Sequence, residues 1–298
     1  MVRRTLRALA ALAALAATPA IAHEPLGMDA APAWTWSFAP WIVALMAASL
    51  AMYWVGLQRL WRRAGAGRGI GTRQAACFAT GWLVLALALT SPLDALGGAL
   101  FSVHMVQHEL LMVVAAPLFV MSRPLEAWTW ALPAAWRQPL AKAGRLRPVA
   151  ATWRAITQPL GAWTLHALAL WGWHVPWLFE AALTNEWLHS LQHASFLASA
   201  LLFWWSVLGR GARRPDGVGL ASLFTTMLHT GALGALLTFA AHPWYGHYAA
   251  GAFGLTALED QQLGGLVMWV PGGLAYMAAG LAIAAAWLAP PRETLPLR

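Results

Sequence analysis

ALFSVHMVQHELLMVVAAPLFVM, residues 99 to 121, is an apolar stretch with one acidic residue, Glu109. A helix rises about 1.5 Å per residue, so this stretch is about 34 Å long and can cross a hydrocarbon core of about 30 Å. The whole chain is similar, with 60% hydrophobic and 10% charged residues and a mean hydropathy of +0.57. Because soluble proteins are nearer half apolar and a quarter charged, the sequence predicts an integral membrane protein.

Seven apolar runs in the 298-residue chain are long enough to be membrane spans. They are approximately Trp41 to Leu60, Gln74 to Ser91, Ala99 to Met121, Pro159 to Phe179, Trp187 to Leu208, Val218 to Ala241 and Leu263 to Leu288. We therefore expect an all-α fold, a polytopic transmembrane bundle of about seven helices. The bundle is expected to form one domain over residues 23–298.

The N-terminus has the pattern of a secretory signal peptide. Three arginines precede an apolar run from Ala8 to Ala17, and the small-residue sequence Ala20-Ile21-Ala22 follows. This order predicts a signal peptide over residues 1–22 with cleavage after Ala22. The alternative is an uncleaved first helix. In both cases the segment from His23 is expected on the external side.

The loop charges predict the orientation of the bundle. All 16 Lys and Arg residues beyond the signal lie on one side, in the loops 59–73, 123–154 and 210–216 and in the tail after Ala289. The opposite loops have none and hold seven acidic residues, Glu24, Asp29, Asp94, Glu180, Glu186, Glu259 and Asp260. The positive-inside rule makes the basic side cytoplasmic, so the mature N-terminus is external and the C-terminus cytoplasmic. The net charge of +8 is thus explained by topology and lipid headgroups, and nucleic acid is excluded as a partner.

Histidines inside the predicted spans indicate a function, because ionisable residues are costly in a membrane. Helix rise places five of them in the outer half, on the third, fourth and fifth spans: His104, His108, His174, His189 and His193. Two of these spans share the pattern H-x-x-Q-H. Residues four apart lie on one helix face, so each pair can offer two imidazoles to a metal ion, with the glutamine orienting a ligand. The alternative is that the histidines bond to neighbouring helices.

Two carboxylates are further candidate ligands. Glu109 follows His108 inside the third span, and could ligate, balance a bound cation or stay protonated. Asp260 lies in the last external loop, which is either solvated or an entry site for metal. Imidazole and carboxylate without thiolate suit copper, zinc or iron, and the single Cys77 excludes a multi-thiolate site within the chain. A cross-helix pair such as His104 and His174 could instead hold haem.

Several motifs of the chain resemble those of the CtaG family of cytochrome c oxidase assembly factors, first described for a caa-type oxidase. The motifs are residues 101–112 with Ala116-Pro117-Leu118 and Arg123-Pro124, Trp171 to Pro176 with Glu180 to Leu183, His189 to Phe196 with Phe203-Trp204-Trp205, and Asp260 to Gly265 with Met268-Trp269. They occur in the expected order, and the resemblance extends from about Trp41 to Trp287.

The resemblance implies a protein of the bacterial cytoplasmic (inner) membrane that matures a haem-copper oxidase, and we expect it to supply or insert copper. The motif positions then carry over to His104, His108, His174, His189, His193 and Asp260. Oxidase subunits and membrane lipids are the expected partners, and we predict metal handling rather than an enzyme with catalytic residues. A haem-binding protein, a membrane di-iron oxygenase and a purely structural scaffold are the alternatives.

Overall fold

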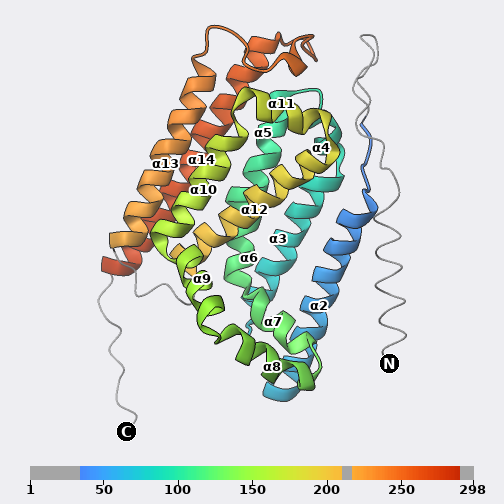
Figure 1. The fold of residues 1–298 in the computed structure, drawn as a ribbon, viewed down its shortest axis with the longest axis vertical. Coiled ribbons are helices and arrows are strands. Elements are labelled where there is room, and N and C mark those ends of the chain that lie inside the picture. Colours follow the sequence, from blue (N-terminus) through green and yellow to red (C-terminus); the bar gives the residue numbers. More distant parts are fainter. Residues whose placement is uncertain (1–33, 210–216, 289–298) are drawn as a thin grey trace.

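The computed structural model describes residues 34–209 and 217–288, and within these ranges it is helical without a named strand. The predicted signal peptide, the segment 23–33, the basic loop 210–216 and the tail 289–298 lie outside the described residues. Figure 1 shows the helices gathered into one bundle. The prediction of an all-α bundle is confirmed.

The longest helices form the body of the bundle. They are α2 (Pro40–Ala64), α3 (Thr72–Thr90), the continuous set α5 (Phe101–Glu109), η1 (Leu110–Ala115) and α6 (Ala116–Ser122), then α10 (Pro159–Trp173), α12 (Glu186–Leu208), α13 (Gly217–Thr238) and α14 (Ala257–Leu288). Among the described residues, six helices are long and apolar enough to span a membrane, namely all of these except α10. The chain is therefore a multi-pass membrane protein.

The fourth predicted span, Pro159 to Phe179, is broken in two. α10 ends at Trp173, and α11 (Pro176–Thr184) begins two residues after His174. Val175 is extended, with φ −64° and ψ 125°, because the ring of Pro176 disfavours a helical residue before it. At 1.5 Å per residue the 15 residues of α10 are only about 22 Å long. This break places His174 at the end of a helix.

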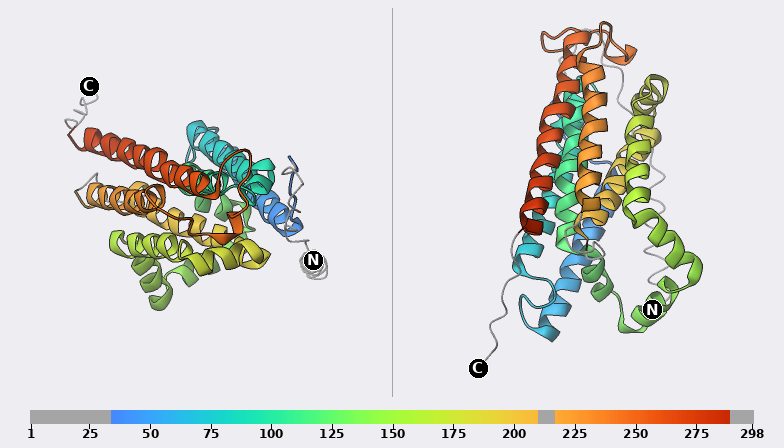
Figure 2. Two further views of the ribbon diagram at one scale, coloured as in Figure 1. Left: turned by 90° about the horizontal axis from the view of Figure 1, so that it is seen from above. Right: turned by 90° about the vertical axis from the view of Figure 1, so that its left-hand side faces the viewer.

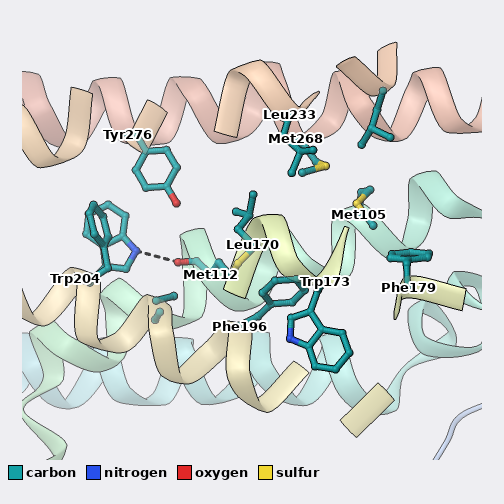
Figure 3. Packing of buried hydrophobic residues seen from close by; sticks show 14 of the residues in the cluster. Met105, Met112, Leu170, Trp173, Phe179, Phe196, Trp204, Leu233, Met268 and Tyr276 are labelled. Atoms are coloured by element: carbon teal, nitrogen blue, oxygen red, sulfur yellow. Dashed lines mark hydrogen bonds between the residues drawn. The ribbon is translucent and has the colours of Figure 1, made fainter. Parts of the chain in front are cut away.

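The set α5–η1–α6, called here the central helix, is the most enclosed span. Of its best 18-residue apolar window 61% is buried, against 17% to 39% in the other five spans. Its apolar side chains, including Met105 and Met112, pack against α10, α12 and α14, as Figure 3 shows. In the π-helical part η1, the carbonyl oxygen of Met112 accepts a hydrogen bond from Trp204 Nε1 at 2.9 Å.

Helices α13 and α14 pack side by side along their length (Figure 2). Their contact is close because glycine faces glycine. A Cβ added at Gly265 would lie 2.6 Å from the carbonyl oxygen of Gly234 and 2.7 Å from the backbone nitrogen of Thr238. Small residues at such a crossing let two backbones approach within a membrane.

The segment 123–158 forms α7 (Pro124–Ala131), α8 (Ala134–Gly144) and α9 (Arg147–Thr157). Part of it is docked on the bundle, because Trp128 Nε1 of α7 donates to the carbonyl oxygen of Ser49 on α2 at 3.1 Å. Figure 1 shows these three helices at one end of the bundle.

The described acidic and basic loops lie at opposite ends of the bundle. α4 (Pro92–Gly97), α11 and the loop 239–256 with η2 (Gly246–Tyr248) lie at one end, which we call the acidic end. The end with α7, α8 and α9 is called the basic end. Which end faces the cytoplasm stays a prediction from the loop charges.

Candidate metal centre

Five histidines meet near the acidic end. Four come from the two H-x-x-Q-H helices α5 and α12, and the fifth, His174, ends α10. The ring centroids are 5.2 Å apart for His104 and His189, 5.7 Å for His104 and His193, 5.2 Å for His108 and His193, and 6.4 Å for His108 and His174. The structure thus brings together all five histidines singled out from the sequence.

Three of them have ligand atoms close enough for one metal ion. Nitrogen atoms of His104, His189 and His193 all lie within 4.8 Å of one another. Nε2 of His108 is 2.8 Å from Nε2 of His104, so the two imidazoles share a proton. Two nitrogens bound to one ion at about 2 Å lie at most about 4 Å apart, so small ring rotations bring the three nitrogens into range. We call these three residues and His108 the histidine cluster.

Hydrogen bonds fix the tautomer of His174. Its Nδ1 lies 2.7 Å from the carbonyl oxygen of Leu170, which can only accept, so Nδ1 carries the proton. Nε2 therefore has a lone pair, and it is buried without a hydrogen-bond partner among the described residues. Nε2 of His193 is also buried without a hydrogen-bond partner among the described residues. Such atoms need a partner, and a metal ion supplies one.

Tyr248 in η2 plays a similar part for His104. Its hydroxyl donates to the carbonyl oxygen of Gly97 at 2.9 Å, and its oxygen lies 3.4 Å from Nδ1 of His104. Burial raises the pKa of Tyr248 well above its ordinary value, so the hydroxyl keeps its proton. The Tyr248 oxygen then accepts from Nδ1 of His104, which leaves Nε2 with a lone pair. Sequence analysis missed Tyr248, because no local pattern connects residues so distant along the chain.

We expect Tyr248→Phe to weaken metal binding by about 10- to 100-fold, the usual effect of removing a group that orients a metal-bound histidine. The measurement is competitive titration of the purified protein with a chelator of known affinity. Tyr53→Phe is the matched control, since that hydroxyl donates to the carbonyl oxygen of Ser122 in α6 at 3.0 Å. Equal affinities for the two variants would rule out this role of Tyr248.

Gln107 lies between two histidines in the sequence, and was expected to orient a metal ligand, but it bonds to other groups. Its Nε2 donates to the carbonyl oxygen of Ala88 at 2.7 Å and to Oδ1 of Asp94 at 2.9 Å. Oδ2 of Asp94 accepts in turn from Ser37 Oγ at 2.6 Å. Gln107 therefore ties α5 to the end of α3 and to α4, and holds the helix that carries His104 and His108.

The two predicted carboxylate ligands lie outside the group of converging nitrogens. Glu109 faces α14, where a Cβ added at Gly272 would be 2.9 Å from its Oε2. Asp260, in the first turn of α14, contacts the start of α5: Oδ2 accepts from the Phe101 nitrogen at 2.6 Å, and Oδ1 from the nitrogen and Oγ of Ser102 at 3.0 and 2.5 Å. In this arrangement Asp260 holds the N-terminus of the helix that carries His104 and His108.

Two histidines of the mid-membrane region have hydrogen-bond partners outside the cluster. His166 bonds to Ser199 Oγ at 3.1 Å and to the hydroxyl of Tyr276 at 3.5 Å. Nδ1 of His229 accepts from Trp171 Nε1 at 3.3 Å. These bonds between neighbouring helices are the structural alternative considered for intramembrane histidines, so not every histidine in a span belongs to the cluster.

The comparisons with known proteins agree with the sequence motifs. The family model described as cytochrome c oxidase caa3 assembly factor matches residues 51–289. Uncharacterized proteins of Mycobacterium bovis and Mycobacterium tuberculosis are each 26% identical over 236 residues, which cover 70% of this chain and 33% of the relative. The chain therefore spans about a third of the length of these curated relatives. No solved structure matches the chain. Since the family model covers most of the sequence, this protein belongs to the family of cytochrome c oxidase caa3 assembly factors.

Proposed function

We propose that this protein binds copper in the histidine cluster and passes it to a subunit of cytochrome c oxidase during assembly. The observation that carries the proposal is the convergence of His104, His189 and His193 from two helices, with one ring nitrogen of each within 4.8 Å of the others. Membership in the assembly-factor family supports the oxidase as the partner. Copper is the cargo here, bound and released rather than retained.

The donor set favours a single ion over haem. Bis-histidine ligation of haem, the arrangement predicted for a cross-helix pair, needs one imidazole on each face of the porphyrin and a flat free space between them. Here the rings pack against one another, with centroids 4.3 Å apart for His104 and His108 and 4.2 Å for His189 and His193. A di-iron oxygenase is also disfavoured, because Glu109 and Asp260 are directed elsewhere. Imidazoles without carboxylate or thiolate suit copper, with zinc as the nearest competitor.

The chain's own groups prepare the site for exchange. Tyr248 holds the proton of His104 on Nδ1, so its Nε2 is available as a donor. In the metal-free protein that atom shares a proton with Nε2 of His108. Copper takes the place of this proton, so His108 must release it or move it to Nδ1, which is buried without a partner among the described residues. Binding is thus coupled to a proton movement, which helps the site to release its cargo.

The test is metal analysis of the purified protein. We expect the variant with both His104→Ala and His193→Ala to lose its bound copper, while the wild type carries about one ion per chain. His229→Ala is the matched control, because it removes an intramembrane histidine outside the cluster. Oxidase activity in cells should fall with the double variant and stay normal with the control.

Two results would contradict the proposal. One is equal copper content in the wild type and the double variant. The other is zinc in place of copper in protein purified from copper-replete cells. A visible spectrum of the same sample, recorded in detergent, separates the haem alternative, because a Soret band that disappears in the double variant would assign the histidines to haem.

A further inference from the structure

A large apolar groove lies between α2 and α12. Its volume is about 900 Å³, and it is bordered by the first half of α2, by α3, α6 and α7 and by one face of α12. Figure 1 shows α12 running obliquely across the bundle and α2 along its right-hand edge. Two members of the histidine cluster, His189 and His193, line this groove. The groove therefore leads from the membrane to the metal centre.

The groove is as long as a membrane is thick. Along α12 its lining runs from Glu186 to Trp205, which at 1.5 Å per residue is about 28 Å. A hydrocarbon core is about 30 Å thick, and a lipid of one leaflet reaches only about half of that. An occupant that fills the groove along α12 must be longer than the acyl chains of one leaflet, and a transmembrane helix has the required length.

The wall formed by α12 is shaped for another helix. Ser190, Ala194 and Ala198, four residues apart, line the groove in a row. Small residues at this spacing let the backbone of a second helix approach. At the acidic end of the same wall is His193, which is 8% exposed and whose Nε2 has no hydrogen-bond partner among the described residues. The row of small residues therefore leads an incoming helix to an available metal ligand.

The two ends of the groove differ in their polar and aromatic residues. Asp94 and Glu186 line it at the acidic end, and no Lys or Arg is among its described lining residues. Trp128, Trp153 and Trp205 line it at the other end, as aromatic residues do at a membrane interface. A complementary helix is apolar in the middle and carries positive charge, such as a metal-bearing or basic group, at its outer end.

We propose that the groove between α2 and α12 receives one transmembrane helix of a partner membrane protein, whose outer end carries copper-binding donors and exchanges copper with His189 and His193. This proposal rests on the proposed function, because it supplies the route by which copper enters or leaves the histidine cluster. The exchange is a transfer of ligands, in which imidazole nitrogens replace or are replaced by donors on the partner, and no electron moves.

The first experiment fills the groove without touching the histidines. Ala194→Trp and Ala198→Trp place bulky side chains on the wall, and Ala232→Trp on the exposed face of α13 is the matched control. In cells that depend on this protein, oxidase activity should fall at least tenfold for the two groove variants and stay normal for the control. Purified groove variants loaded with Cu(I) should keep their copper, which separates this proposal from copper binding itself. Normal oxidase activity in both groove variants would overturn the docking proposal.

The second experiment identifies the occupant of the groove. It tests the docking proposal even if a tryptophan variant also loses copper. A photo-crosslinking amino acid replaces Leu202, which lines the groove on α12. The adduct formed in intact cells is digested, and the crosslinked peptide is sequenced by mass spectrometry. A peptide from a transmembrane segment of another membrane protein supports the proposal. Adducts only with lipid, or only with a second copy of this chain, contradict it.

Discussion

Replacement of Asp260 by alanine is expected to lower the free energy of unfolding of the metal-free protein by about 3 kcal/mol, because three hydrogen bonds to α5 are lost at about 1 kcal/mol each. The carboxylate is 2% exposed, and its partners are the nitrogens of Phe101 and Ser102 and the hydroxyl of Ser102. Without it, those buried donors have no acceptor. The start of α5 should then loosen, and His104 with it.

The measurement is thermal or denaturant unfolding of protein purified in detergent without metal. Glu259→Ala is the control: the neighbouring acid is exposed and bonds only to Thr256 among the contacts described, so a much smaller loss is expected. The comparison also separates two roles for Asp260. A residue that only binds metal would leave the metal-free protein as stable as the wild type, and that outcome would contradict the positioning role.

Gly265→Ala should lower the free energy of unfolding by a similar amount, about 3 kcal/mol, which is the upper part of the usual range for overpacking a tight contact. The added methyl group would meet backbone atoms of Gly234 and Thr238, which cannot move aside as a side chain can. α13 and α14 must therefore separate along the line where they pack. The start of α14 carries Asp260, so the damage should reach the histidine cluster as well.

Gly280→Ala is the matched control on the same helix, because a Cβ at Gly280 meets no atom within 4 Å. That change should be neutral or slightly stabilising, since alanine is a better helix former than glycine by up to about 1 kcal/mol. Unfolding in detergent compares the two variants. A Gly265→Ala protein as stable as Gly280→Ala would show that the two backbones are not in close contact.

Local sequence patterns predict much of this molecule. Apolar run length predicts the spans, and the spacing of His104 and His108, like that of His189 and His193, predicts that each pair shares a helix face. Depth along the helices then predicts that the five histidines meet, and the structure places them in contact. The break between α10 and α11 was not predicted, although Pro176 indicates it, because the run of apolar residues continues through the proline.

The partners of the polar residues could not be read from the sequence. Gln107 reaches Asp94, Asp260 reaches Phe101 from 159 residues away, and Tyr248 reaches His104 from 144 residues away. Such pairs depend on which helices become neighbours, and one sequence holds no record of packing order. The groove between α2 and α12 could not be predicted for the same reason, since it depends on how these two helices are placed relative to each other.

The π-helical turn in the central helix has a consequence for how this protein can vary. A π-helical turn takes up about one residue more than an α-helical turn, so the residues beyond it face roughly 100° away from where an uninterrupted α-helix of the same sequence would place them. Deleting one residue from 110–115 should therefore restore a continuous α-helix and leave α6 in the same orientation relative to His104 and His108. The local change would fall on the turn whose Met112 carbonyl accepts from Trp204. The chain can thus gain or lose one residue at this turn while the imidazoles of α5 and the side chains of α6 keep their neighbours.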